Sequence, residues 1–188
     1  MRARALLILG VLAMAVALAG CKKDPIEKLS DDLDSLKLDV RLAAIQALRD
    51  YAVKTEDERA IELLIEALET DEDVTDQAGD ALVVVGRVLN KPDEKPDKVT
   101  ELLARTLANT HLDSPIRTKA AWALGEIGDR EAIPALKPGR DAVDAKGAVD
   151  TDTRAASVVA LEKLGYTTKT SAMEIPPGAD KPESTEGS

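Results

Sequence analysis

Aromatic residues are nearly absent from this sequence. Its 188 residues include no phenylalanine, one tryptophan and two tyrosines. A buried core must therefore be built from leucine, isoleucine, valine and alanine. Alanine has the highest helix propensity, and its small side chain lets neighbouring helices approach closely. The composition favours an all-helical fold.

Histidine and cysteine are equally scarce, with His111 and Cys21 as the single examples. The sequence contains no G-x-S-x-G, H-E-x-x-H, C-x-x-C, Walker or G-x-G-x-x-G motif. His111 falls in a turn between two predicted helices, where a solvated loop residue is the simplest interpretation. We therefore expect a protein that is not an enzyme and that carries no metal and no cofactor.

Basic residues are outnumbered, with 25 Lys and Arg against 35 Asp and Glu and a net charge of −10. Nucleic acid binding needs a Lys/Arg footprint for the phosphates, so this balance argues against a nucleic acid partner. Loss of Arg2 and Arg4 with a cleaved leader would leave about −12 from side chains.

Two groups of acids invite a catalytic or metal-binding interpretation. Asp71, Asp73 and Asp76 look like part of a calcium loop, but the turn glycine and the distal glutamate of an EF-hand are missing. We expect them to cap a helix that begins near Asp73. Asp31 and Asp32 are adjacent on a helix and point to different sides, so solvated surface is favoured over an acid–base pair.

The first twenty residues have the three parts of a secretory signal. Arg2 and Arg4 precede an apolar run from Leu6 to Ala19, and small residues follow. The run is short of the ~20 apolar residues that a membrane-spanning helix needs. We interpret residues 1–20 as a signal peptide.

The segment Leu18-Ala19-Gly20-Cys21 resembles the bacterial lipobox. The resemblance implies that Cys21 becomes the first mature residue and is lipidated, which would anchor the chain stably in a membrane. Residues 21–24 would then form the lipidated N-terminus and a short tether. An ordinary signal peptide or an uncleaved anchor is the alternative. Lys22, in place of aspartate, favours the outer membrane, facing the periplasm, over the inner membrane.

Four segments of the chain align without gaps, beginning at residues 40, 74, 116 and 153 and so separated by 34, 42 and 37 residues. Such spacings are typical of stacked helical pairs. In the first segment Val40, Ala44, Ala47, Leu48 and Tyr51 lie on one helical face. A short helix from 26 to 36 precedes it. The sequence thus predicts a repeat domain over 25–165 and, from its polar and proline-rich composition, a disordered tail over 166–188.

Several residues have the chemistry of helix ends. Asp24 before a proline, Thr55 in a Thr-Glu-Asp-Glu run and Ser114 before a proline are expected to cap helices. Gly128 and Gly165 stand where helices should end.

The third repeat, Ile116-Arg117 through Gly128-Asp129 and on to Leu136, resembles the HEAT-like repeat named after phycobilisome lyases. The resemblance implies a right-handed α-solenoid of about four HEAT-like helical hairpins, with the second helix of each pair on the concave side. Thr75 replaces the usual arginine in the second repeat, and Pro138-Gly139 shortens a helix of the fourth.

Four side chains are candidates for partner binding: Trp122, Arg41, Arg117 and Arg154. Trp122 takes a variable position beside the core stripe, where it either fills the groove between repeats, which we favour, or anchors a partner. The resemblance implies that the arginines, at equivalent positions, pair with acids of neighbouring repeats. The alternative is a row of guanidinium groups facing a carboxylate-bearing partner.

These observations together predict a membrane-anchored lipoprotein that acts as a protein-binding scaffold or adaptor in the bacterial cell envelope. The concave face would take a protein or peptide. A small-molecule carrier or accessory enzyme that uses the groove is one alternative, and a purely structural envelope lipoprotein is another. The sequence gives no indication of the oligomeric state.

Overall fold

The computed structural model describes residues 24–90 and 98–166. The predicted signal peptide, the lipidation site Cys21, residues 22 and 23 of the tether and all of the tail but Tyr166 lie outside these residues. Within them the chain forms eight α-helices and one 3-10 helix. Extended pairing in this part of the chain is limited to an isolated bridge between Val143 and Val149. Every helix within the described ranges is too short or too polar to span a lipid bilayer.

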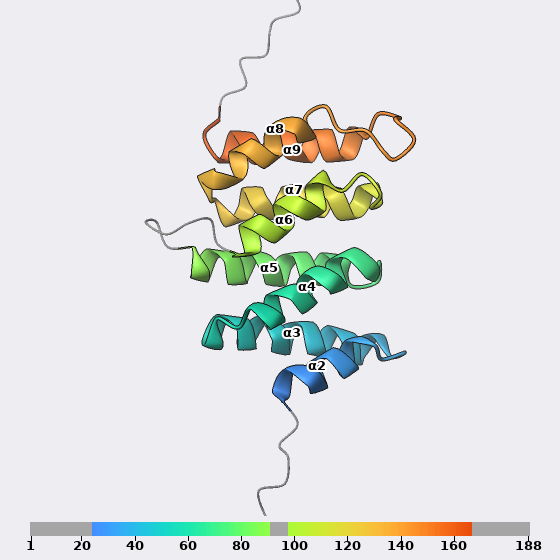
Figure 1. Ribbon diagram of the computed structural model, residues 1–188, viewed down its shortest axis with the longest axis vertical. Coiled ribbons are helices and arrows are strands. Elements are labelled where there is room, and N and C mark those ends of the chain that lie inside the picture. The colour runs from blue at the N-terminus through green and yellow to red at the C-terminus, as the bar shows by residue number, and fades with distance from the viewer. Residues whose placement is uncertain (1–23, 91–97, 167–188) are drawn as a thin grey trace, which may run out of the picture.

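The helices follow one another as four hairpins stacked along the long axis of the molecule (Figure 1). The predicted fold class, an all-α solenoid of about four helical hairpins, is confirmed. The first helix ends at Leu33 rather than at residue 36, and Leu36 is fully exposed. In order, the elements are α2 (Pro25–Leu33), α3 (Leu38–Thr55), α4 (Glu58–Thr70), α5 (Thr75–Leu89), α6 (Lys98–Ala108), α7 (Ser114–Ile127), η1 (Arg130–Ala132), α8 (Ile133–Gly139) and α9 (Thr151–Lys163).

The hairpins form two layers around one core. The first helices, α2, α4, α6 and α8, make one layer, and the second helices, α3, α5, α7 and α9, make the other (Figure 1). A single cluster of buried aliphatic side chains runs from Ile26 to Leu164 through all four hairpins. No hairpin could bury its apolar face alone, so each depends on its neighbours.

The second helices contact one another more extensively than the first helices do. The concave role of the second helices, which the resemblance implies, stays a prediction. We call the outer surface of α3, α5, α7 and α9 the second-helix face. The outer surface of α2, α4, α6 and α8 is the first-helix face.

Small residues permit the closest of these contacts. A Cβ atom on Gly125 of α7 would lie 2.8 Å from the Cα of Ala160 in α9. Glycine is therefore required at position 125 by the approach of two backbones. At the end of α7, Gly128 has φ +83° and closes the helix as predicted.

The helix starts are capped by aspartates more often than predicted. Asp24 accepts a hydrogen bond from Ile26 N at 3.1 Å, as expected. The prediction of a capping role for Thr55 is wrong, because Thr55 is the last residue of α3 and its hydroxyl donates back to Tyr51 O at 2.8 Å. Asp57 caps α4 instead. Ser114 is the first residue of α7, and Asp113 takes the capping position.

Candidate functional site

Two of the predicted arginines link consecutive repeats. Arg41 in α3 lies 2.6 Å from Asp71 (Nε to Oδ2) and 2.9 Å from Asp73 (Nη2 to Oδ2), at the start of the next repeat. Arg117 in α7 lies 3.0 Å from Asp150 Oδ2, which precedes α9. Asp71 and Asp150 each stand three residues before an aligned repeat start. Both guanidinium groups therefore point between repeats, as the favoured prediction has it, and Arg117 is buried.

The Arg117–Asp150 pair is buried, and Arg117 Nη1 donates a hydrogen bond to Asp150 Oδ2. Asp150 also accepts hydrogen bonds from Ser114 Oγ at 2.6 Å and from Thr153 N at 3.1 Å, and so caps α9. Burial alone would raise the pKa of the Asp150 carboxyl. The bonds from Ser114 and Thr153 and the charge of Arg117 outweigh that effect, so the pKa lies below its ordinary value.

The series of arginine–aspartate pairs between repeats is interrupted where the sequence departs from the repeat pattern. In the second repeat Thr75 replaces arginine, is buried, and donates from Oγ1 to Asp71 O at 3.0 Å. Arg154 belongs to the last hairpin of the described chain, so no following hairpin can supply an acid. It donates from Nε to Ala142 O at 2.9 Å. The arginine–aspartate pairs therefore link neighbouring repeats at two places, through Arg41 of the first repeat and Arg117 of the third.

The other residues singled out in the sequence are the acids near Asp73 and the single histidine. The prediction that Asp71, Asp73 and Asp76 cap a helix is wrong: α5 begins after Val74 without a side-chain cap, and the first two acids bind Arg41. No group of three or more His, Cys, Asp and Glu side chains in the described ranges could hold a metal ion. Exposed His111 lies in the α6–α7 turn, where its backbone N donates to Asn109 Oδ1 at 3.1 Å.

Trp122 lies half-buried on the second-helix face of α7 and packs against the core. The ammonium group of Lys119 stands 3.9 Å from the centre of its ring. Lys119 Nζ also lies 2.9 Å from Asp80 and 3.3 Å from Asp76, both in α5. Lys119 thus ties α5 to α7 and fixes the Trp122 ring by a cation–π contact.

A second tie on the same face centres on Glu126 of α7. Its carboxylate pairs with Arg87 of α5, at 2.8 Å from Nη2, and with Lys163 of α9. The hydrogen bond from Lys163 holds the pKa of Glu126 below its ordinary value, although burial opposes this. Sequence analysis missed Lys119 and Glu126. Glu126 and Lys163 take equivalent positions in adjacent repeats, four residues after Trp122 and Val159, but the sequence does not show that their side chains meet.

An apolar groove of about 370 Å³ lies between α7 and α9 beside Trp122. Val159 on its wall is 49% exposed. Trp122 therefore packs between repeats, as the favoured prediction has it, and also lines an accessible groove, while its role as a partner anchor stays a prediction. Asp152 and Lys163 supply the charged groups of the groove. Its lining comprises Thr118, Trp122, Asp152, Ala155, Ala156, Val159, Ala160 and Lys163.

Stacked helical hairpins with one shared core define the protein as an α-solenoid. The family model of the PBS lyase HEAT-like repeat matches residues 40–70 and 116–139. The first match covers most of α3 and all of α4, and the second covers most of α7 with η1 and α8. These two segments of the chain are therefore similar to HEAT-like repeats, in agreement with the resemblance of the third repeat. A comparison with curated proteins finds no match.

Proposed function

We propose that this protein is a lipid-anchored scaffold of the bacterial cell envelope that binds a partner protein through its second-helix face. HEAT-like repeats suggest a scaffold or binding protein. The observation that carries the proposal is the apolar groove at Trp122 and Val159. It lies on a face that Lys119 and Glu126 fix by ion pairs between hairpins. A fixed apolar groove loses little conformational entropy when it binds a side chain.

The anchor is supported by the lipobox-like sequence that ends at Cys21. Residues 22–24 alone separate Cys21 from the start of α2. The described chain begins at one end of the stack and ends at the other (Figure 1). Lipidation of Cys21 would therefore hold the first hairpin close to the bilayer and place the Trp122 groove at the far end. Lys22 after the cysteine favours the outer membrane, facing the periplasm.

We propose further that the protein catalyses no reaction and needs no cofactor. The groove is lined mainly by apolar and small side chains, with one carboxylate and one ammonium group. This lining suits an apolar side chain of a protein or peptide. An enzyme or small-molecule carrier, the second candidate, would use converging polar groups in an enclosed pocket.

Photo-crosslinking in the native envelope tests the partner. A photoreactive residue replaces Val159 in the full anchored chain, and a matched chain carries it at Glu131, an exposed residue outside the groove. We expect a discrete adduct from position 159, which is absent from position 131 and lost with Trp122→Ala. Equal adducts from both positions, or adducts unchanged by Trp122→Ala in a folded protein, would contradict the proposal.

Cell fractionation with mass spectrometry tests the anchor. The mature wild-type protein should begin at Cys21, carry acyl chains and sediment with membranes. Cys21→Ser should remove the acyl chains and release the protein from the membrane fraction. A wild-type N-terminus without acyl chains would remove the anchor and leave the partner proposal standing.

A further inference from the structure

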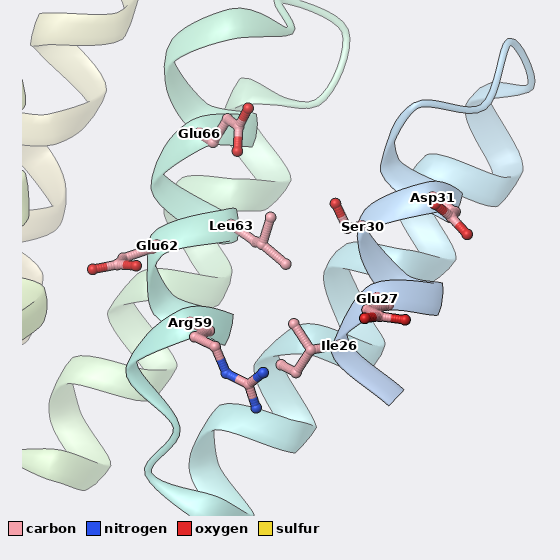
Figure 2. Close-up of a pocket in the computed structure, with 8 residues that line it drawn as sticks. All are labelled: Ile26, Glu27, Ser30, Asp31, Arg59, Glu62, Leu63 and Glu66. Atoms are coloured by element: carbon pink, nitrogen blue, oxygen red, sulfur yellow. The ribbon is translucent and has the colours of Figure 1, made fainter. Parts of the chain in front are cut away.

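The first-helix face carries a second groove, of about 460 Å³, between α2 and α4. Figure 2 shows Ile26 from α2 and Leu63 from α4 pointing toward one another across it. Acidic side chains stand on both helices around this apolar pair (Figure 2). The groove therefore has an apolar floor and an acidic rim, unlike the groove at Trp122. The rim carboxylates are those of Glu27, Asp31, Glu62 and Glu66.

The charge of the rim is strongly negative. The one cation of the lining is Arg59, which lies 2.7 Å from Asp24 Oδ2 and 2.8 Å from Asp57 Oδ2. Two carboxylates outside the lining thus compensate its charge. Lys98 approaches Glu62 only to 4.0 Å. The lining thus carries more carboxylates than cations, and this charge balance favours a cationic partner.

The groove continues along the same two helices. A further hollow of about 80 Å³ shares Ser30, Leu63 and Glu66 with the first and extends to Leu33 and Thr70. From residue 59 to residue 70 of α4 the helical rise of 1.5 Å per residue gives a length of about 16 Å. This length matches roughly three turns of an added helix.

We propose that the α2–α4 groove binds a basic amphipathic helix of a partner protein. Apolar side chains at i, i+4 and i+7 of that helix would lie over Ile26, Leu63 and Leu33, as helix-in-groove recognition requires. Lysine or arginine on its flanks would face the rim carboxylates. The same carboxylates repel anionic lipid and nucleic acid, so a cationic protein segment is the occupant that the charge favours. This site is separate from the groove at Trp122.

A synthetic helical peptide of about 16 residues, with an apolar Leu stripe flanked by Lys, serves as the probe. The full chain is held in neutral detergent micelles, and binding is followed by fluorescence anisotropy of the labelled peptide. We expect saturable binding that weakens as salt is raised, because rim charges act through screened attraction. A peptide with Glu in place of Lys should not bind. Absence of binding by the Lys peptide would overturn the proposal.

A charge-neutralising variant locates the peptide. Glu27→Gln, Glu62→Gln and Glu66→Gln together should weaken binding at least about tenfold, since each removes a rim carboxylate without removing side-chain volume. Unchanged affinity in this triple variant would overturn the proposal.

The matched control loses the same number of acids at the far end of the stack, through Glu131→Gln, Asp141→Asn and Glu162→Gln. These side chains are exposed and lie outside both grooves. We expect the control to bind the peptide within about twofold of wild type, because screening limits charges that lie beyond a Debye length. Equal weakening in the control would mean that net charge alone attracts the peptide.

Two further variants separate the grooves and test the apolar floor. Leu63→Ala should weaken binding several-fold, whereas Leu102→Ala, at a comparable half-buried position of α6, should not. Trp122→Ala should bind the peptide like wild type while losing the adduct at position 159. Loss of peptide binding in Trp122→Ala would place the peptide on the second-helix face and contradict this inference.

Discussion

At the residue scale, the buried ion pair of Arg117 and Asp150 joins the third hairpin to the fourth. Their side chains are 4% and 2% exposed, so each charge depends on the other for compensation. Such a pair need not stabilise more than an apolar pair would, but removal of one partner leaves a buried charge unpaired. Arg41 makes the equivalent link near the surface, where Asp73 is 69% exposed. Loss of an acidic partner should therefore lower the free energy of unfolding more at Arg117 than at Arg41, although both arginines take the same repeat position.

The first prediction compares these two links. Asp150→Ala should lower the free energy of unfolding by about 3–5 kcal/mol, because it strands the Arg117 charge and removes the α9 cap. Asp73→Ala should cost at most about 1 kcal/mol, since the Asp73 charge is solvated and Arg41 keeps its pair with Asp71. Urea unfolding followed by circular dichroism measures both values. Equal costs would show that Asp150 is not a buried partner of Arg117.

The second prediction concerns pH. The pKa of Asp150 is lowered in the folded state from an ordinary value of 3.8, so its ionised form stabilises the fold above that pH. This stabilisation is lost as pH falls through the folded-state pKa. The difference in unfolding free energy between wild type and Asp150→Asn should therefore be constant at neutral pH and shrink below about pH 4. A difference that grows on acidification would contradict the assigned direction of the pKa shift.

The resemblance to HEAT-like repeats predicted Arg41 and Arg117 as links between repeats, because both take the repeat position at which the family carries its pairing arginine. It did not assign the roles of Lys119 and Glu126, because their partners depend on how far each hairpin is displaced from the next. The accessible surface beside Trp122 could not be predicted either. It arises from the small side chains of Ala155 and Ala156 on α9, which leave space between the helices.

At the scale of the helix, the contact between α7 and α9 depends on glycine. Gly125 faces the backbone of Ala160, and backbone cannot move aside as a side chain can. Gly79 of α5 faces the aliphatic part of Lys119, a flexible side chain. The two helical glycines should therefore respond differently to an added methyl group.

The third prediction follows from this difference. Gly125→Ala should destabilise the protein by about 1–3 kcal/mol, because overpacking outweighs the gain in helix propensity. Gly79→Ala should cost less than Gly125→Ala, since the Lys119 side chain can shift at the expense of its contacts with Asp80 and Trp122, whereas backbone cannot, and the helix propensity rises by up to about 1 kcal/mol. Thermal and urea unfolding of the two variants gives the comparison. A Gly125→Ala protein more stable than Gly79→Ala would mean that α7 and α9 are not in backbone contact.

The positions of the helices were largely predictable, because the periodicity of aliphatic residues is a local signal. The helix ends were harder to predict. In α3 the buried residues are Ala44, Ile45, Leu48 and Ala52, while the predicted Val40 and Tyr51 are half-buried. The true face is therefore rotated slightly from the predicted one. Contact with three neighbouring helices, α2, α4 and α5, sets that rotation, and the sequence of α3 alone does not contain it.

At the scale of the whole molecule, the repeats predicted the stack and its order. The two grooves were not predicted, because each is formed by side chains of two helices that belong to different hairpins. The Trp122 groove lies on the second-helix face near the C-terminal end, and the α2–α4 groove lies on the first-helix face near the N-terminal end. Anchoring through Cys21 would place the acidic groove close to the membrane and the apolar groove away from it.

The central claim is that the four hairpins form one cooperative stack, which holds both grooves in place. Hydrogen–deuterium exchange of wild type and Leu124→Ala tests it most directly, since Leu124 of α7 is fully buried. The substitution should cost about 2–5 kcal/mol. Amide protection should then fall in α5 and α9 as well as in α6 and α7, because neighbouring repeats share the lost contacts. Loss of protection confined to α6 and α7 would contradict the claim.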